Sequence, residues 1–391
     1  MASQTETTAA KERRRKLANG EGGYRERPNG LWECRISLPN GKRKSIYGKS
    51  FEECRDNRRQ AEREQERGLD LSAKRQTVEA FLAAWLEETA KPTLRPKTHH
   101  SYAQLIRLHI VPALGKTELA KLTPHQVQAM MAAMTTKGLS PRSVQYTRAV
   151  LRRALGHALK WELVSRNVAT LVDPPRSVRK PVHALTADQA RGFLDGVRAA
   201  DDRLWPLYTA AVLTGLRQAE LLGLRWTDLD LTSGTLRVAH TLQRVSGEWS
   251  FVEPKTKRSA RALSLPAVVV SAFQVQKDRQ AFERKAAGAA WIDRGLVFTT
   301  PKGTPLEPSN LSKRLHASLE AAGLPKQGMH ALRHCCASLL LAQGVSARVV
   351  MEQLGHSQIS LTMDTYSHVM PAMLREAANA LDKAFENAKT G

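Results

Sequence analysis

The spacing of apolar and polar residues divides the chain into a strand-rich beginning and a mainly helical remainder. Short alternating segments at the beginning are separated by two Pro-Asn-Gly turns, at residues 28–30 and 39–41. They predict three strands, at residues 23–27, 31–38 and 42–47. A helix is expected from there to about residue 67, with Ser50 as its N-cap and Glu53 at the capping-box position. This region, residues 23–70, is predicted to be a small three-stranded β-sheet with one helix.

A helical period takes over in the next region, and residues 76–172 are predicted to form an all-α domain. The first helix buries a stripe of apolar residues: Val78, Phe81, Leu82, Trp85 and Leu86. Three more helices are expected at residues 97–110, 124–134 and 141–161, the last two capped by Thr123 and Ser140. The last helix has an apolar line formed by Val144, Leu151, Leu155 and Leu159.

Residues 173–182 contain prolines and no period, which indicates a linker before a third domain at residues 183–391. That domain is predicted to be mixed α+β and mainly α. Helices are expected after the cap Thr186, over residues 202–214, over residues 303–324 and from residue 328 onward. Strands are expected at residues 235–244, 248–254 and 260–266, with a lysine-bearing hairpin at 254–259 and a short buried segment at 291–300. A final stripe, Leu374, Ala378, Leu381 and Phe385, fits a C-terminal helix.

Charge narrows the class of partner. The 391 residues carry a formal net charge of +23, spread along the chain, and residues 1–22 form a basic arm expected to be disordered. This indicates a polyanion partner, and the low aromatic content favours duplex DNA over single strands. No apolar run could span a bilayer and no signal peptide is present, so we expect a protein of the cytoplasm without a membrane partner. Four cysteines (Cys34, Cys54, Cys335, Cys336) do not make a disulfide framework.

The chemistry concentrates between residues 328 and 369. His330 and Arg333 are three residues apart, so they share a helix face that can bind one oxyanion. His356 follows in the sequence LGH, and Tyr366 follows ten residues later in a polar segment that leaves its phenol available. Further upstream, Arg217 stands at the entry of a helix, where free amides add to its positive field.

Two features close to these candidate residues in the sequence are explained better by a structural role than by a chemical one. Glu220 is expected to support an arginine rather than to react. His330 and His334 are four residues apart beside Cys335 and Cys336, which superficially resembles a zinc site. The glutamate expected between the histidines and a CxxC pair are both absent, so we interpret the two cysteines as small packing residues.

The HxxR motif at residues 330–333, LGH at 354–356 and the tyrosine ten residues on resemble the phage-integrase family of tyrosine site-specific recombinases. The resemblance implies that Tyr366 attacks a DNA phosphate and forms a 3′-phosphotyrosine. It implies that Arg217 and Arg333 stabilise the transition state, that His330 helps to deprotonate the tyrosine and that His356 binds the phosphate. A lysine of the 254–259 segment would be the general acid, with Lys255 preferred and Lys257 in reserve. No cofactor and no metal are implied.

The resemblance also assigns the three domains. Residues 23–70 would bind arm-type DNA sites through the sheet, and residues 76–172 would bind core-type sites. The expected DNA-binding residues are Arg35, Lys42, Arg43, Lys44, Arg142, Arg148, Arg152, Arg153 and Lys257. The partners implied are double-stranded DNA, three further copies in a homotetramer, and as candidates an accessory DNA-bending protein and a directionality factor. The setting implied is the cytoplasm of a bacterial host, at the nucleoid.

Alternatives remain open at this point. The chain could be a DNA-binding regulator or architectural protein with an inactive recombinase fold, although all six catalytic positions are occupied. A chromosome-dimer resolvase would share the chemistry but lack the first 70 residues. A type IB topoisomerase-like enzyme would also use Arg, Lys and Tyr, but the LGH motif and the domain order favour recombination. Residues 23–70 could also be a protein interaction module, and the C-terminal helix could dock on its own domain or on a neighbouring protomer.

Overall fold

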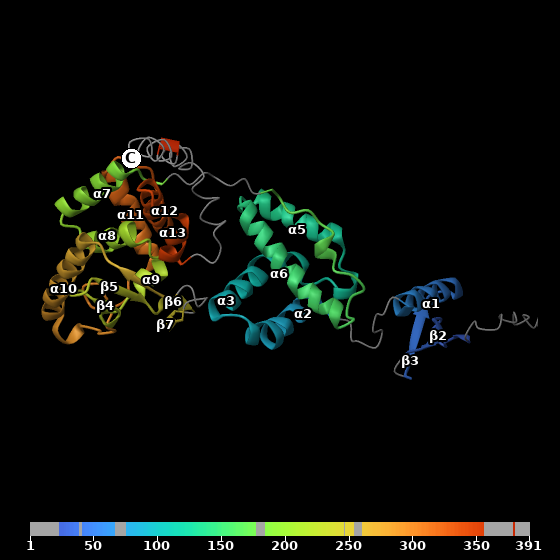
Figure 1. Ribbon diagram of the computed structural model, residues 1–391. Helices are drawn as coiled ribbons and strands as arrows, with labels where there is room; N and C mark the ends of the chain where they lie inside the picture. Colours follow the sequence, from blue (N-terminus) through green and yellow to red (C-terminus); the bar gives the residue numbers. More distant parts are fainter. Residues whose placement is uncertain are drawn as a thin grey trace, which may run out of the picture. The chain divides into compact units, whose positions relative to one another are not determined.

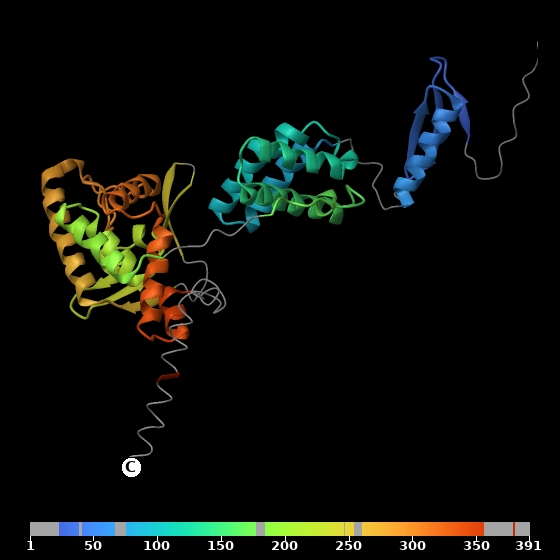
Figure 2. The same cartoon turned by 90° about the horizontal axis from the view of Figure 1, so that it is seen from above.

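The computed structural model describes residues 23–38, 41–66, 76–176, 184–245, 247–253, 260–355 and 378–379. The chain divides into two units, Met1–Val178 and Arg179–Gly391. Within them the described elements form three groups, one sheet with a helix, one helical group and one mixed group (Figures 1 and 2). Among the described residues, no helix combines the length and the apolar character that crossing a membrane requires.

The first group is the predicted sheet and helix. Its strands are antiparallel in the order β1-β2-β3: β1 Tyr24–Glu26, β2 Trp32–Ser37 and β3 Arg43–Gly48. Helix α1 (Phe51–Glu66) packs on one sheet face, where Cys34, Ile36, Cys54 and Ala61 are buried. Ser50 accepts the N–H of Glu53 at 3.1 Å, while the Glu53 carboxylate accepts the N–H of Lys49 at 2.7 Å. The predicted strands, helix and cap are therefore confirmed, with the reciprocal bond made one residue before the N-cap.

The second group contains only helices, as predicted. Its main elements are α2 Val78–Ala84, continued by π-helical Trp85–Ala90; α3 Pro96–Leu105, continued by π-helical Ile106–Ile110 and α4 Val111–Leu114; α5 Pro124–Thr136; and α6 Pro141–Lys160. Short 3₁₀ turns lie at Lys91–Thr93, Leu119–Lys121 and Val168–Thr170. The caps Thr123 and Ser140 are confirmed, and the five apolar residues predicted for the first helix are all buried.

One prediction for α6 is wrong. Val144, Leu151 and Leu155 are buried as expected, but Leu159 is 41% exposed. Seven residues make almost two full turns, so the line through Val144 and Leu151 continues to Ala158, which is fully buried. Leu159 is one position, or about 100°, further round the helix and faces solvent.

The third group is mixed and mainly helical. Its helices are α7 Ala187–Ala199, α8 Trp205–Thr214, α9 Gln218–Leu222, α10 Ala267–Ala287, α11 Pro308–Ala321, α12 Met329–Ala342 and α13 Ala347–Leu354, with 3₁₀ turns at Trp226–Asp228 and Gly288–Ala290. Its strands are β4 Leu229–Asp230, β5 Thr235–Val238, β6 Thr241–Val245, β7 Glu248–Val252 and β8 Arg261–Ser264. The predicted cap Thr186 and the helix end at Gly215 are confirmed.

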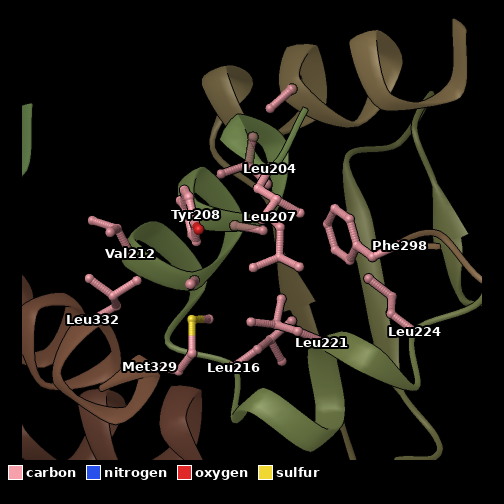
Figure 3. Packing of buried hydrophobic residues seen from close by; sticks show 14 of the residues in the cluster. Leu204, Leu207, Tyr208, Val212, Leu216, Leu221, Leu224, Phe298, Met329 and Leu332 are labelled. Atoms are coloured by element: carbon pink, nitrogen blue, oxygen red, sulfur yellow. The ribbon is translucent and has the colours of Figure 1, made fainter. Parts of the chain in front are cut away.

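Helix α8 is the centre of this group. It packs against both α10 and α12, and nine of its ten residues are buried. Leu207 and Tyr208 of α8 meet residues that approach from other elements, among them Leu221, Phe298 and Met329 (Figure 3). A helix that is apolar on all sides is stable only inside a core. This core fixes the ends of α8, α9 and α12, where the candidate site lies.

The strand predictions for this group are wrong in their pairing. The segment 235–244, expected as one strand, is divided into β5 and β6, which belong to different sheets. One sheet has the order β4-β5-β8, while β6 pairs with β7 alone. The strands on either side of residues 254–259 therefore do not pair with each other as the expected hairpin. Residues 254–259 themselves lie outside the described part of the chain.

Helix α10 is not among the predicted elements, because its buried face carries polar side chains. Gln276 and Gln280 lie beside Val269, Ala272 and Phe273 on that face. The amide of Gln276 donates to the Val297 carbonyl at 2.9 Å, and that of Gln280 donates to the Leu296 carbonyl at 3.0 Å. The glutamines thus satisfy the backbone of the predicted buried segment at 291–300, whose residues Leu296–Thr299 are buried.

Candidate active site

Arg333 lies on the second turn of α12 and is only 1% exposed. Its Nη1 donates to the Gly215 carbonyl at 2.7 Å, and its Nη2 donates to the Leu354 carbonyl at 2.6 Å. Gly215 caps the C-terminus of α8, and Leu354 is the last residue of α13. The carbonyls at a helix C-terminus lack partners within the helix and carry partial negative charge. Two helix ends therefore bind this buried guanidinium.

Arg217 is the N-cap residue of α9, which confirms its predicted position at a helix entry. Its backbone N–H donates to Oε2 of Glu220 at 2.9 Å, and its Nη1 donates to Oε1 at 2.7 Å. Its Nη2 donates to the Gly355 carbonyl at 2.9 Å. The side chain is 36% exposed, so part of the guanidinium reaches solvent.

Glu220 is buried between two arginines. Besides Arg217, it accepts hydrogen bonds from Nη1 and Nη2 of Arg261, at 3.4 and 3.2 Å. Burial works to raise the pKa of the carboxyl, but the charge and hydrogen bonds of Arg261, and then those of Arg217, outweigh it and hold the pKa below its ordinary value. Glu220 is thus ionised, and its expected role in supporting an arginine is confirmed by these contacts.

Three arginines meet three successive carbonyls at the end of α13. Nε of Arg261 donates to Gln353 at 2.6 Å, Arg333 donates to Leu354, and Arg217 donates to Gly355. These carbonyls are the ones that a helix C-terminus leaves without intrahelical partners. The arginines come from β8, α12 and the start of α9, so the end of α13 joins three distant segments. Sequence analysis did not identify Arg261, since alternation along a short strand indicates only which side its residues face.

Glycine is required where α8 and α13 meet. Gly215 and Gly355 both adopt the left-handed conformation, with φ of 66°. A Cβ on Gly215 would lie 2.4 Å from Cδ2 of Leu354 and 3.2 Å from Sγ of Cys336. The two helix ends approach as closely as they do because position 215 has no side chain.

His330 stands in the first turn of α12, on the predicted helix. Burial, and then the positive charges of Arg333 and Arg217, lower the pKa of its imidazole. The ring packs edge-on against His334, with centroids 4.8 Å apart. Burial, together with His330 and Arg333, lowers the pKa of His334 to about 4. Both histidines are therefore neutral at pH 7, and a neutral imidazole can accept a proton.

The two cysteines of α12 are core residues. Cys335 and Cys336 are buried free thiols, and burial raises the pKa of the Cys335 thiol to about 11 and that of Cys336 to about 12. This confirms their predicted packing role. Across the part of the chain that the structure describes, no cluster of three or more His, Cys, Asp or Glu residues could hold a metal ion.

The structure brings together three of the six predicted catalytic residues, namely Arg217, His330 and Arg333. The other predicted active-site positions, Lys255, Lys257, His356 and Tyr366, lie outside the described residues. Gly355 immediately precedes His356 in the sequence, and its carbonyl is bound by Arg217. In the described part of the site, Arg217 and Arg333 therefore form a cationic corner, and the neutral His330 lies beside it.

The sheet of the first group carries a second set of basic residues. Glu33 of β2 is buried and accepts from Nε of Arg25 at 2.8 Å, Nε of Arg27 at 2.9 Å and Oγ of Ser45 at 2.8 Å. Nε of Arg35 lies 3.7 Å from the same carboxylate. Hydrogen bonds from Arg27, then Ser45 and Arg25, hold the pKa of Glu33 far below its ordinary value.

These residues occupy the sheet face away from α1, because Glu33 and Arg35 alternate along β2 with the buried Cys34 and Ile36. The predicted DNA-binding residues Lys42 and Arg43 are exposed, and Lys44 is partly buried. Arg25 and Arg27 were missed by sequence analysis. Their signal was the alternation of arginine with other residues along the first strand.

The predicted DNA-binding residues of α6 point in two directions. Arg148 and Arg152 are four residues apart and share one side of the helix. Arg142 and Arg153 lie on another side, and Arg153 has its guanidinium over the Tyr102 ring, 5.8 Å from the centroid. Arg142, Arg152 and Arg153 are exposed, whereas Arg148 is partly buried.

Comparison with known proteins relates both the site and the fold to one family. The profile of the phage integrase family matches residues 183–373, and that of the phage integrase N-terminal SAM-like domain matches residues 77–134. An integrase of Staphylococcus phage L54a is 32% identical over 237 residues, which cover 58% of this chain and 67% of that protein. A protein named tyrosine recombinase XerC-like, from Caldanaerobacter subterraneus, is 28% identical over 88% of this chain and 93% of its own length.

A solved structure shares the fold. The integrase of the transposon Tn1549, in complex with a circular intermediate DNA, superposes with a TM-score of 0.67 at 22% identity. The match covers 78% of this chain and 99% of that one.

Proposed function

Because this chain belongs to the phage integrase family and is a site-specific tyrosine recombinase, we propose that it integrates the DNA of a phage or another mobile element and, with a partner, excises it. The observation that carries the proposal is the convergence of Arg217 and Arg333 on the end of α13, beside a neutral His330. Such a corner suits a phosphoryl-transfer site, because guanidinium groups fixed in place stabilise charge on phosphate oxygens.

In the proposed reaction, the phenolate oxygen of Tyr366 attacks a DNA phosphorus in line with the 5′ oxygen. The bond from phosphorus to that oxygen breaks, and a 3′-phosphotyrosine and a free 5′ hydroxyl remain. Arg217 and Arg333 stabilise the charge on the two non-bridging oxygens, and His356 donates a hydrogen bond to the phosphate. Rejoining is the reverse reaction with the 5′ hydroxyl of another strand.

Proton transfer is assigned to two further residues. His330 accepts the proton of Tyr366, whose ordinary pKa near 10 makes the neutral phenol a poor nucleophile. The lowered pKa of His330 keeps its imidazole neutral and able to do so at pH 7. Lys255 protonates the departing 5′ oxygen, and Lys257 is the alternative for that role.

The reaction conserves the phosphodiester energy in the phosphotyrosine, so it needs no ATP. The two arginines and the lysine provide the positive charge that Mg²⁺ provides in other phosphoryl-transfer enzymes. We therefore expect the reaction to proceed without a metal or another cofactor.

The other two groups of elements would also bind DNA. We assign residues 76–172 to core-type sites, through Arg142, Arg148, Arg152 and Arg153 on α6, and residues 23–70 to arm-type sites through the sheet. Residues 173–182 would be the linker, and residues 183–391 the catalytic domain. Exchange between two duplexes requires four cleavages, so the active form would be a homotetramer on DNA, acting in the cytoplasm of the bacterial host.

The proposal is tested with a duplex that the full-length chain selects from a random-sequence pool, nicked in turn at each position of the selected sequence. A nick lets the short product diffuse away, which traps the covalent intermediate. We expect a protein–DNA adduct on a denaturing gel that survives EDTA and is absent for Tyr366→Phe. Tight binding without any adduct would instead support the inactive regulator, and an adduct that persists in Tyr366→Phe would show that another residue is the nucleophile.

A further inference from the structure

Arg261 has contacts that no catalytic assignment uses. It is the first residue of β8, paired with Val238 of β5, and its side chain is 8% exposed. Its Nε binds the Gln353 carbonyl at 2.6 Å, while Nη1 and Nη2 bind the two carboxylate oxygens of Glu220. One guanidinium thus joins three segments of the site, since its partners are 92 and 41 residues away in the sequence.

The charges around Glu220 explain why a second arginine matters. Glu220 and Arg217 alone would form a pair without net charge, and the carboxylate would reduce the attraction of Arg217 for a phosphate. With Arg261 the three side chains carry a formal net charge of +1. Arg261 also binds both oxygens of Glu220, so the carboxylate that holds Arg217 is itself fixed.

The hydrogen bonds at the end of α13 also connect Arg261 with Arg217 and Arg333. Arg261, Arg333 and Arg217 bind consecutive carbonyls, Gln353 to Gly355, so the position of any one of them constrains the other two. Arg261 also begins the strand that follows residues 254–259, and its partner Gln353 lies three residues before His356. At 8% exposure it is too enclosed to be an ordinary contact with the DNA backbone.

We propose that Arg261 is a positioning residue for strand cleavage, which holds Glu220 and the end of α13 so that the charge of Arg217 is directed at the scissile phosphate. This inference rests on the proposed function, because it assigns Arg261 a part in that reaction. A positioning role of Arg261 differs from a purely structural link between β8 and α13 in one measurable respect. Loss of Arg261 should matter in proportion to the negative charge on the phosphate.

The experiment measures single-turnover cleavage of the selected, nicked duplex by full-length protein in excess. The variants are Arg261→Gln and Arg217→Gln, with Arg237→Gln as the matched control, because Arg237 is an exposed arginine of the neighbouring strand β5. Arg261→Gln is expected to slow cleavage on the order of 10- to 100-fold, with DNA affinity changed by less than about threefold. Arg237→Gln is expected to cleave at nearly the wild-type rate.

The deciding readout is a second substrate, in which a methyl group replaces one non-bridging oxygen of the scissile phosphate and removes its charge. The defect of Arg261→Gln is expected to shrink about tenfold on this methylphosphonate, in parallel with that of Arg217→Gln. Arg261→Lys provides the same test if the glutamine variant does not fold. It keeps the charge near Glu220, but a single ammonium nitrogen does not reproduce the fork that binds both Glu220 and Gln353.

A defect of equal size on both substrates would overturn the proposal in favour of a structural link, and so would a variant that cleaves like wild type. These results are distinct from failure of the proposed function. In that case the wild-type protein itself would form no adduct on any nicked duplex, whereas the Arg261 comparison is made only on a duplex that wild type cleaves.

Discussion

Two buried glutamates organise arginines in this protein, and the arginines differ in what else they bind. Glu220 in the catalytic unit holds Arg217 and Arg261, and both also donate to carbonyls at the end of α13. Glu33 in the N-terminal sheet holds Arg25, whose side chain is 63% exposed, and Arg27, whose guanidinium also lies over the Tyr47 ring, 5.1 Å from its centroid. One buried carboxylate therefore belongs to a cluster whose arginines also bind backbone carbonyls, and the other belongs to a cluster that includes an exposed arginine.

The difference matches two kinds of DNA contact. A guanidinium held by a carboxylate and by backbone carbonyls has one orientation, which suits stabilisation of a single phosphate in a transition state. An exposed guanidinium anchored at one point can adjust to a groove, and its interactions are weakened by salt.

The largest effect is expected for Arg333→Gln. The variant removes a charge from the transition state and leaves the carbonyls of Gly215 and Leu354 without these donors. Cleavage of the nicked duplex should fall about 1,000-fold or more, while binding of intact duplex remains within about tenfold. Arg348→Gln is the control, because Arg348 is an exposed arginine on α13 whose ion pair among the described residues is an i,i+4 contact with Glu352. Similar cleavage by Arg333→Gln and wild type would show that the buried guanidinium is structural.

The second prediction concerns the stability of the catalytic unit. Glu220→Gln leaves two arginines without their shared carboxylate, of which Arg261 is largely buried. Unfolding by urea should show a loss on the order of 3 kcal/mol. Glu283→Gln breaks a different partly buried ion pair, with Arg203, and serves as the comparison. If the Glu220 variant lost no more stability than a surface substitution, the Glu220 cluster would not be the rigid one of the two.

Acid separates the two regions in a third way. The pKa of His334 is lowered to about 4, so the folded protein binds fewer protons than the unfolded chain between that pH and the ordinary histidine value near 6.5. Stability from this group is therefore complete above pH 6.5 and is lost as pH falls, on the order of 3 kcal/mol by pH 4. His334→Asn should flatten this dependence in urea unfolding followed by circular dichroism.

The N-terminal region provides the internal control for that measurement. Residues 23–70 contain no histidine, and the pKa of Glu33 is held far below its ordinary value. The ¹⁹F resonance of Trp32 in protein labelled with fluorotryptophan should therefore report little change in local unfolding between pH 7 and pH 4.5. An acid transition of equal size at both sites would contradict the assignment to His334.

The smallest effect is expected for Glu33→Gln. Removing the carboxylate frees Arg25, Arg27 and Arg35 from a common anchor and adds one positive charge to the sheet. Affinity for an unrelated duplex should rise about two- to fivefold, and the preference for the duplex selected from the random-sequence pool should fall by a similar factor. Gel-shift titrations at two salt concentrations measure both, with Glu52→Gln on α1 as the control for charge alone. Improved discrimination would show that the carboxylate does not orient the arginines.

Sequence analysis identified the parts of the site that local rules govern. The position of Arg217 follows from a helix entry after a glycine cap, and the placement of His330 and Arg333 follows from helical spacing. The strands around Glu33 follow from two turns and strict alternation. In each case the signal lies within a few residues of the feature it predicts.

The features that were missed depend on contacts between distant segments. Arg261 matters through Glu220 and Gln353, and no local pattern links these positions. The helical period of α10 is hard to see in the sequence because two polar residues, both glutamines, occupy its buried face. These glutamines are tolerated there because their amides donate to the carbonyls of residues 296 and 297. The pairing of β8 with β5 rather than with β7 likewise joins segments that are separated in the sequence.

The absence of a side chain at Gly215 makes this residue a spacer of minimal size. Even one methyl group there would collide with Leu354, whose carbonyl is one of the two that bind Arg333. The ends of α8 and α13 both bind the guanidinium of Arg333, and the lack of a side chain at position 215 allows these two helix ends to lie close together. Alanine at position 215 would therefore require the Leu354 side chain to shift and would place a side chain on a left-handed backbone that L residues rarely adopt.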